Sequence, residues 1–471
     1  MKKIMMTMVI GAFTFVGTLA FWAKDADAIP VFARKYGLSC NSCHTMFPKL
    51  SKMGVAFRER GFRFAEGKED QEMQNGPGKN IDTGDESPAA VLASNFPFTL
   101  RTQITYSGAG PILANDGNVV MPGQPMGMID KGLVEASPGQ WTSNRKIGLG
   151  ELGLISSGSY DNIGWWIDAS QNGIGMAEVL YYFNDLFKVR VGRVQNDVGY
   201  GMTMMSQRPL GFGAVNAAQM AGGTMLMMGD GISVHGTTNG DSGVGTLYNF
   251  SAFTYGKNAT QANKTTTAFY GRLAQEIADD YIVGVYAYRA SNYGSDAFGG
   301  GRKMLMAMGR PATPAQVAAN SLLGTHATVM QFKNVTRYGV DFALNYGEPL
   351  QMWGAVTLGN NRSTAPGNEK LDVRAITVAA EYIVTDGIML GVKWDQTRVD
   401  LKMGGNKKVR PKTTNNITVY GLYQVAQNVQ GFVSYTNTRN LVTSMGAMGG
   451  KTVVRQQNTL NTIVAGLDFA L

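Results

Sequence analysis

Apolar and polar residues alternate along most of the chain from about residue 95 to the last residue. In 98–106, apolar and aromatic residues fill the even positions, with one threonine among them, while Thr, Arg and Gln fill the odd positions. The stretches 163–170, 187–195, 338–346 and 462–471 repeat this pattern. A period of two predicts β-strands with one apolar and one polar face. A soluble β-sandwich would alternate too, but with shorter strands and more even connections.

The connections between these strands alternate in length. Short turns are expected at 160–162, 184–185, 278–280, 347–349, 385–387 and 426–428. Long loops are expected near 107–145, 196–222, 291–334, 360–371, 400–414 and 440–457. Short periplasmic turns and long extracellular loops alternate in this way in outer-membrane β-barrels. We therefore predict an all-β transmembrane barrel of about sixteen strands over 91–471, with a range of about fourteen to eighteen because 196–245 has the weakest pattern.

The composition agrees with a membrane barrel. Charged residues make up 16% of the chain, against about 25% in soluble proteins. Glycine is abundant at 60 residues, and there are 19 Tyr and 21 Phe. After the N-terminus no apolar run reaches the ~20 residues of a membrane helix. The net charge of +8 includes no basic cluster, so we expect no nucleic-acid partner, and we expect outer-membrane lipid around the barrel.

Residues 1–28 have the three parts of a secretory signal peptide. Lys2 and Lys3 form the basic start, 4–22 is apolar, and Ala26-Asp27-Ala28 is a small-residue cleavage pattern. An uncleaved anchor helix is the alternative. Cleavage and export would place the mature chain in the bacterial outer membrane.

The segment 29–90 contains the most specific motif, Cys40-Asn41-Ser42-Cys43-His44. Cys40 and Cys43 are the only cysteines of the chain. The Cys-x-x-Cys-His spacing predicts attachment of one c-type haem, because two thiols can bond the two vinyl groups and the adjacent imidazole can ligate the iron. We therefore expect Cys40 and Cys43 to hold the haem covalently and His44 to be its proximal axial ligand.

Two other readings of the motif are weaker. A Cys-x-x-Cys redox disulfide would normally lie at a strand–helix junction of a βαβ unit, which the sequence does not show. A structural zinc site needs four Cys or His ligands. The remaining histidines, His235 and His326, are remote in sequence.

The residue on the far side of the haem is not fixed by the sequence. A methionine there would raise the reduction potential. If the stretch after the motif is helical, as its spaced apolar residues suggest, Met46 and Met53 lie on the proximal side, so Met73 is the better candidate. The barrel wall could also supply this ligand, with His235 or His326, although both histidines also suit ordinary barrel or loop positions.

Few other residues suggest chemistry. Arg101, Lys188 and Arg190 are predicted to face the lumen, either as ordinary wall residues or as contacts to haem propionates. The 27 methionines form short runs that could bind soft metals but more often fill apolar space. We find no catalytic triad, phosphate loop or nucleotide fingerprint. The 66–90 stretch is polar and rich in Gly and Pro, as a linker would be.

The residues around the motif resemble the fused monohaem cytochrome–porins of iron-oxidising bacteria. The resemblance covers about 29–63 and rests on Ile29-Pro30-x-Phe32-Ala33-Arg34-Lys35-Tyr36-Gly37, Phe47-Pro48-x-Leu50 and Gly54-x-x-Phe57-Arg58-x-x-Gly61. It implies an outer-membrane cytochrome that oxidises extracellular Fe(II), an Fe(II):cytochrome c oxidoreductase, and passes the electron to a periplasmic cytochrome c or another periplasmic carrier. The alternatives are a substrate-specific porin with a haem-bearing plug, and electron export to an extracellular acceptor.

Overall fold

The computed structural model describes an N-terminal segment and the strands of a barrel. The described residues are 40–46, 49–62, 98–109, 112–114, 119–120, 144–160, 162–170, 173–195, 228–238, 245–257, 265–277, 281–294, 331–344, 349–363, 370–385, 387–403, 407–426, 429–445 and 453–470. The predicted signal peptide, Met73 and His326 lie outside them.

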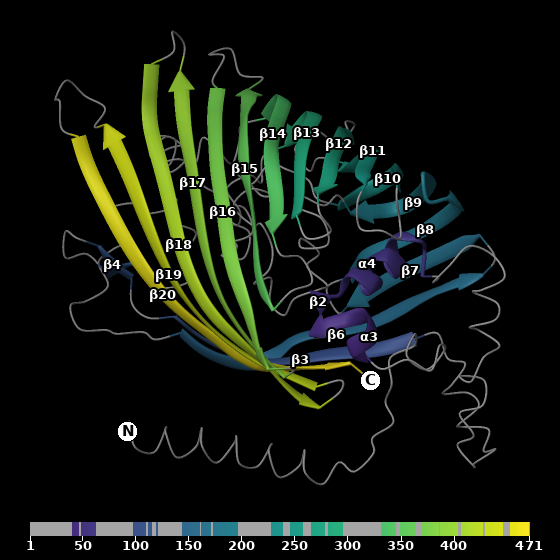
Figure 1. The fold of residues 1–471 in the computed structure, drawn as a ribbon. Coiled ribbons are helices and arrows are strands. Elements are labelled where there is room, and N and C mark those ends of the chain that lie inside the picture. Colours follow the sequence, from purple (N-terminus) through teal and green to yellow (C-terminus); the bar gives the residue numbers. More distant parts are fainter. Residues whose placement is uncertain are drawn as a thin grey trace, which may run out of the picture.

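Sixteen antiparallel strands close into one barrel, as predicted (Figure 1). They are β3 (Phe98–Ala109), β6 (Asn144–Tyr160), β7 (Ile163–Ser170), β8 (Gly173–Asn184), β9 (Phe187–Gln195), β10 (Met228–Thr237), β11 (Thr246–Lys257), β12 (Thr265–Ile277), β13 (Tyr281–Gly294), β14 (Gln331–Leu344), β15 (Leu350–Ser363), β16 (Lys370–Thr385), β17 (Ile388–Met403), β18 (Lys407–Ala426), β19 (Val429–Met445) and β20 (Val453–Ala470). The last strand, β20, pairs with the first, β3, and this pairing closes the wall. A short hairpin of β4 (Ile112–Ala114) and β5 (Val119–Val120) follows β3, and β4 also pairs with β20.

The alternation of the sequence becomes an apolar exterior and a polar interior. On β3, Leu100 and Ile104 are exposed on the outside, whereas Arg101 and Gln103 are buried on the inside. Val191 and Phe269, which are 53% and 57% exposed, belong to a set of exposed large apolar residues on almost every strand, and so extensive an apolar surface fits a lipid surround. A polar inner wall and an apolar outer wall are the arrangement of transmembrane barrels.

All the predicted short turns join neighbouring strands at one end of the barrel, which we call the turn end. β7 and β9 have the bounds expected from the sequence, and β3 starts and β20 ends at this same end. The other end, which we call the loop end, has the long connections after β3, β9 and β13. An even strand number therefore brings both ends of the barrel sequence to one side of the membrane.

Two of the predicted long loops are wrong. Most of 400–414 and 440–457 is strand, because β17 continues to Met403, β18 begins at Lys407, and β19 and β20 pair up to Met445 and Val453. The polar residues of these stretches resemble a loop in the sequence. Strands are paired by backbone hydrogen bonds, however, so a strand that lies in water can carry polar side chains on both faces. With 20 residues, β18 exceeds the ~9–11 that cross a bilayer, so its polar end projects beyond it.

Candidate functional site

The Cys-x-x-Cys-His motif forms a compact segment of two short helices and a small two-stranded sheet. The helix α3 spans Cys40–Cys43, and α4 spans Lys52–Glu59. Between them β1 (His44–Met46) pairs with β2 (Lys49–Leu50), an element that the sequence did not predict. Figure 1 draws both helices within the outline of the barrel, and the contacts described below place the end of α4 beside β6, β7 and β8.

The motif itself is one helical turn. Positions 40 and 43 of such a turn lie on one face, because residues three apart in a helix are neighbours. The Cys43 side chain is a half-buried free thiol, and the half-buried His44 follows it directly. This backbone suits two thioether bonds to a single porphyrin with the imidazole next to them, so the residues present fit a c-type haem.

Ser51 joins the motif to α4 through three hydrogen bonds. Its backbone N–H donates to the Cys43 carbonyl at 2.8 Å, and its hydroxyl donates to the Ser42 carbonyl at 3.1 Å. The same hydroxyl accepts from the Gly54 N–H at 3.2 Å, which is the bond of a helix N-cap. Ser51 is therefore the common hydrogen-bond partner of the motif carbonyls and of the first turn of α4, and it fixes α4 relative to α3.

The C-terminus of α4 ends in a Schellman motif. The Phe62 N–H donates to the Phe57 carbonyl and the Gly61 N–H to the Arg58 carbonyl, both at 2.9 Å. Gly61 and Phe62 have φ of 74° and 67°, a conformation that suits glycine and is uncommon for phenylalanine. The Phe57 and Phe62 rings pack edge to face at 6.1 Å, the apolar contact that accompanies this cap.

This capped end of α4 lies directly against the inner wall. A Cβ at Gly164 of β7 would lie 2.4 Å from the Gly61 carbonyl oxygen, and a Cβ at Gly61 would lie 2.6 Å from Leu180 of β8. Backbone therefore meets backbone at Gly61 and Gly164, and only glycine allows this approach. We call the contact of Arg60, Gly61 and Phe62 with the wall the dock.

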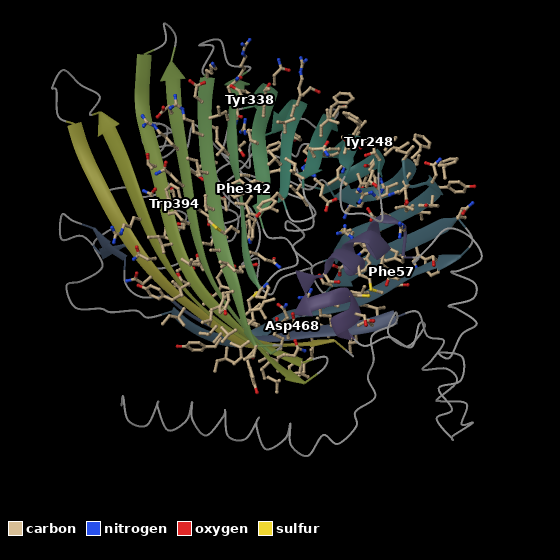
Figure 2. The ribbon with its side chains drawn as sticks, in the orientation of Figure 1. Phe57, Tyr248, Tyr338, Phe342, Trp394 and Asp468 are labelled. Carbon is tan, nitrogen blue, oxygen red and sulfur yellow. The ribbon has the colours of Figure 1, made fainter. Side chains whose placement is uncertain are left out.

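Two further contacts complete the dock. The Phe62 ring stacks on Trp166 of β7 with ring centroids 5.4 Å apart, and the Ser159 hydroxyl donates to the Phe62 carbonyl at 3.0 Å. Phe57 and Phe62 are both buried by this packing. Figure 2 shows Phe57 on α4, on the inner side of the wall.

An ion pair holds the dock to the turn end. Arg60 donates from Nε and Nη2 to the two carboxylate oxygens of Asp185, at 3.2 and 3.3 Å. Asp185 lies in the turn between β8 and β9 and also accepts from the Tyr182 hydroxyl at 3.1 Å. Burial alone would raise the pKa of Asp185, but Arg60, with smaller effects of Lys188 and Tyr182, holds this pKa below its ordinary value.

A small cavity of about 10 Å³, which is room for about one water molecule, lies between the dock and the wall. Arg58 and Phe62 of the N-terminal segment line it together with Trp166, Glu178, Arg190 and His235 of the barrel. Arg190 pairs with Glu178 at 3.9 Å. His235 is therefore a buried wall residue that faces the docked segment, and it is the only barrel histidine in the part of the chain that the structure describes.

The three predicted lumen cations all face inward and are buried. Arg101 forms a two-pronged pair with Asp468, at 3.1 and 2.7 Å, and Gln103 donates to the same carboxylate at 2.9 Å. Arg101 therefore has a partner within the wall, as its reading as an ordinary wall residue expects. Lys188 and Arg190 lie on β9 near the dock. Met53, expected on the proximal side, is 40% exposed on α4.

The dock residues on the wall were missed by the sequence analysis. Gly164 and Trp166 occupy inward positions of β7, where the pattern predicts polar residues. A glycine and a tryptophan on the face that lines the lumen could have indicated a contact with another segment there. Asp185 was recognised only as part of a turn. Among the described residues no group of His, Cys, Asp and Glu forms a metal site of three or more ligands. No described helix is long and apolar enough to cross a membrane.

Comparisons with known proteins concern the barrel. No family model and no curated protein matches the chain. Among solved structures it is similar to OmpT, an outer membrane protein of Vibrio cholerae (TM-score 0.47, 11% identity, 79% of this chain and 97% of that one). It is also similar to the outer membrane channel DcaP of Acinetobacter baumannii (0.47, 10%, 79% and 97%) and to an anion-selective porin from Comamonas acidovorans (0.46, 10%, 79% and 100%).

Proposed function

We propose that this protein is an outer-membrane c-type cytochrome that oxidises Fe(II) from outside the cell and passes the electron to a periplasmic carrier. The observation that carries the proposal is the docking of a Cys-x-x-Cys-His segment on the inner wall of a transmembrane barrel. A soluble electron carrier has no need of the barrel, and a simple pore has no need of this motif.

The chain's own residues would divide the work as follows. Cys40 and Cys43 would hold the haem covalently, and His44 would ligate its iron. A haem bound there would supply a one-electron Fe(III)/Fe(II) couple. Ser51 fixes the motif to α4, and Arg60, Gly61 and Phe62 fix α4 to the wall. Neither helix is long enough to be stable alone, so the wall keeps the site in one place.

The position of the dock has a consequence for the electron donor. Asp185 and Gly164 lie at the turn end, so a haem held by the docked segment would be nearer to carriers in the periplasm than to the loop end. The hydrocarbon layer is about 30 Å thick, too far for one efficient tunnelling step. We therefore propose that Fe(II) enters the lumen from the loop end and gives up its electron there, with the resulting Fe(III) leaving by the same route.

A second candidate is a solute-conducting porin in which the docked segment is a plug. The polar, charged inner wall of a sixteen-stranded barrel favours this reading, since barrels of that size leave an aqueous channel. Purified holoprotein in planar bilayers separates the two. A conductance that rises when the dock is broken, with no redox reaction toward Fe(II), would support the porin.

The deciding experiment combines a redox titration with rapid mixing. The protein is expressed in a host that attaches c-type haem, and covalent haem is measured by mass and by spectrum, with Cys43→Ser as control. Anaerobic stopped-flow with Fe(II) at acidic pH should then reduce the haem. If its spectrum stays oxidised, the proposal fails, and a low reduction potential would point to electron export instead.

A further inference from the structure

A band of charged side chains follows the apolar band on the outside of β15, β16 and β17, at the loop end. Residues that are paired across these strands form rows. The row of Gly354, Val378 and Trp394 is apolar. Two rows further toward the loops, Leu358 is followed by Arg374 and Arg398.

The next rows are entirely polar or charged. Asn360, Asp372 and Asp400 form one row, and Arg362, Lys370 and Lys402 form the row beyond it. Rows on one face lie about 7 Å apart. We therefore take the level at which the charge begins as the headgroup level of the membrane. Figure 2 labels Trp394 on the part of the wall below this level.

The pairing of Arg374 with Arg398 places two positive charges directly opposite each other. Directly opposite residues on one face have Cβ atoms about 5 Å apart, and like charges there are destabilising. Arg398 pairs with Asp400 at 3.1 Å, and Lys370 with Asp372 at 3.1 Å. No carboxylate among the described residues pairs with Arg374 or Arg362, and both are exposed.

The turn end of the same strands is different. Its outward residues are apolar or aromatic: Leu350, Met352, Tyr382, Val384 and Leu390 are all exposed. The excess positive charge thus occurs at only one of the two membrane surfaces for these strands. A surplus of arginine at the headgroup level of one leaflet fits phosphate, which the planar guanidinium binds in two-pronged pairs.

We propose that Arg362, Arg374 and Arg398 form a binding site for the phosphorylated headgroup of an outer-leaflet glycolipid. The acyl chains would lie on the apolar band below, against Val356, Leu358 and Trp394, which are all exposed. The lipid phosphate supplies the negative charge between Arg374 and Arg398. This site depends on the barrel lying in the membrane and is independent of any cofactor in the lumen.

The test uses the full-length protein in detergent and native mass spectrometry with two lipids, diphosphorylated and dephosphorylated lipid A. The protein should retain the diphosphorylated form. Arg374→Gln with Arg398→Gln should weaken this binding about 30-fold, or about 2 kcal/mol, at ~1 kcal/mol per basic residue near the surface. Arg289→Gln controls for the loss of one exposed arginine outside the site, on the outside of β13 near the loop end, and should weaken binding about 5-fold at most.

Three results would overturn the site. The first is equal retention of the two lipids by the wild-type protein, a comparison that needs no variant to fold. The second is equal binding by the double variant and the Arg289→Gln control. The third is displacement of the lipid by millimolar inorganic phosphate, which would identify a site for soluble phosphate instead.

Discussion

Replacing Gly164 by alanine tests whether the dock holds the motif in place. The added Cβ would lie 2.4 Å from the Gly61 carbonyl oxygen and 2.9 Å from the Gly61 carbonyl carbon and Cα. All three are backbone atoms, so no side-chain rotation relieves the clash and the end of α4 must move away. Overpacking of this kind costs about 1–3 kcal/mol, which would raise the undocked fraction about 5- to 150-fold.

Hydrogen exchange measures that fraction. A helix of eight residues is not stable alone, so α4 unfolds when it leaves the wall and its amides exchange. Exchange over 52–62 should therefore accelerate in Gly164→Ala and more so in Gly164→Leu. Gly431→Ala is the control, because its Cβ would meet no atom closer than 3.7 Å. Exchange that is as slow in both Gly164 variants as in the control would refute the backbone contact.

Three further changes have defined outcomes. The ion pair of Arg60 and Asp185 is partly shielded from water, so Asp185→Asn and Arg60→Gln should each weaken docking by ~1 kcal/mol. The double variant should weaken docking little more than either single variant does. Additive effects in the exchange assay would mean that the two residues do not interact. The pKa of Asp185 is lowered in the docked state, so its contribution is complete above about pH 4 and is lost as the pH falls through the lowered pKa. The protection of the amides of 52–62, taken relative to their intrinsic exchange rate at each pH, should therefore fall in acid in the wild type but not in Asp185→Asn. Asp468→Asn should lower barrel stability by about 2 kcal/mol, because the buried Arg101 loses its two-pronged carboxylate partner. The measurement is a lower midpoint of urea unfolding, and a midpoint equal to the wild type would show that water reaches this pair.

The barrel could be predicted from the sequence because each of its rules is local. Alternation along β3 or β14 already determines which face meets lipid, and short polar turns such as 385–387 determine the strand order. The upper parts of β17 to β20 could not be predicted in this way. Their polar residues lie beyond the hydrocarbon, where neither face needs to be apolar, so the pattern that marks a strand is lost.

The dock could not be predicted because it joins residues that are far apart in the chain. Gly61 and Gly164 approach each other only because a Schellman motif turns the end of α4 toward β7, and the pattern around either glycine says nothing about the other. The motif at 40–44 was visible because its chemistry is contained in five neighbouring residues. Arg60 and Asp185 are single charges whose pairing depends on the closed wall.

The helix α4 connects Ser51, which is bonded to the motif, with the dock on the wall. Both of its ends are fixed, so its length sets the angle of the motif about the helix axis as well as its height in the lumen. One inserted residue would turn the motif by about 100° and move it by about 1.5 Å, which would direct the same three side chains at a different part of the wall. Seven inserted residues would nearly restore the angle and change only the height. The length of α4, eight residues, therefore determines the direction in which the motif faces inside the barrel.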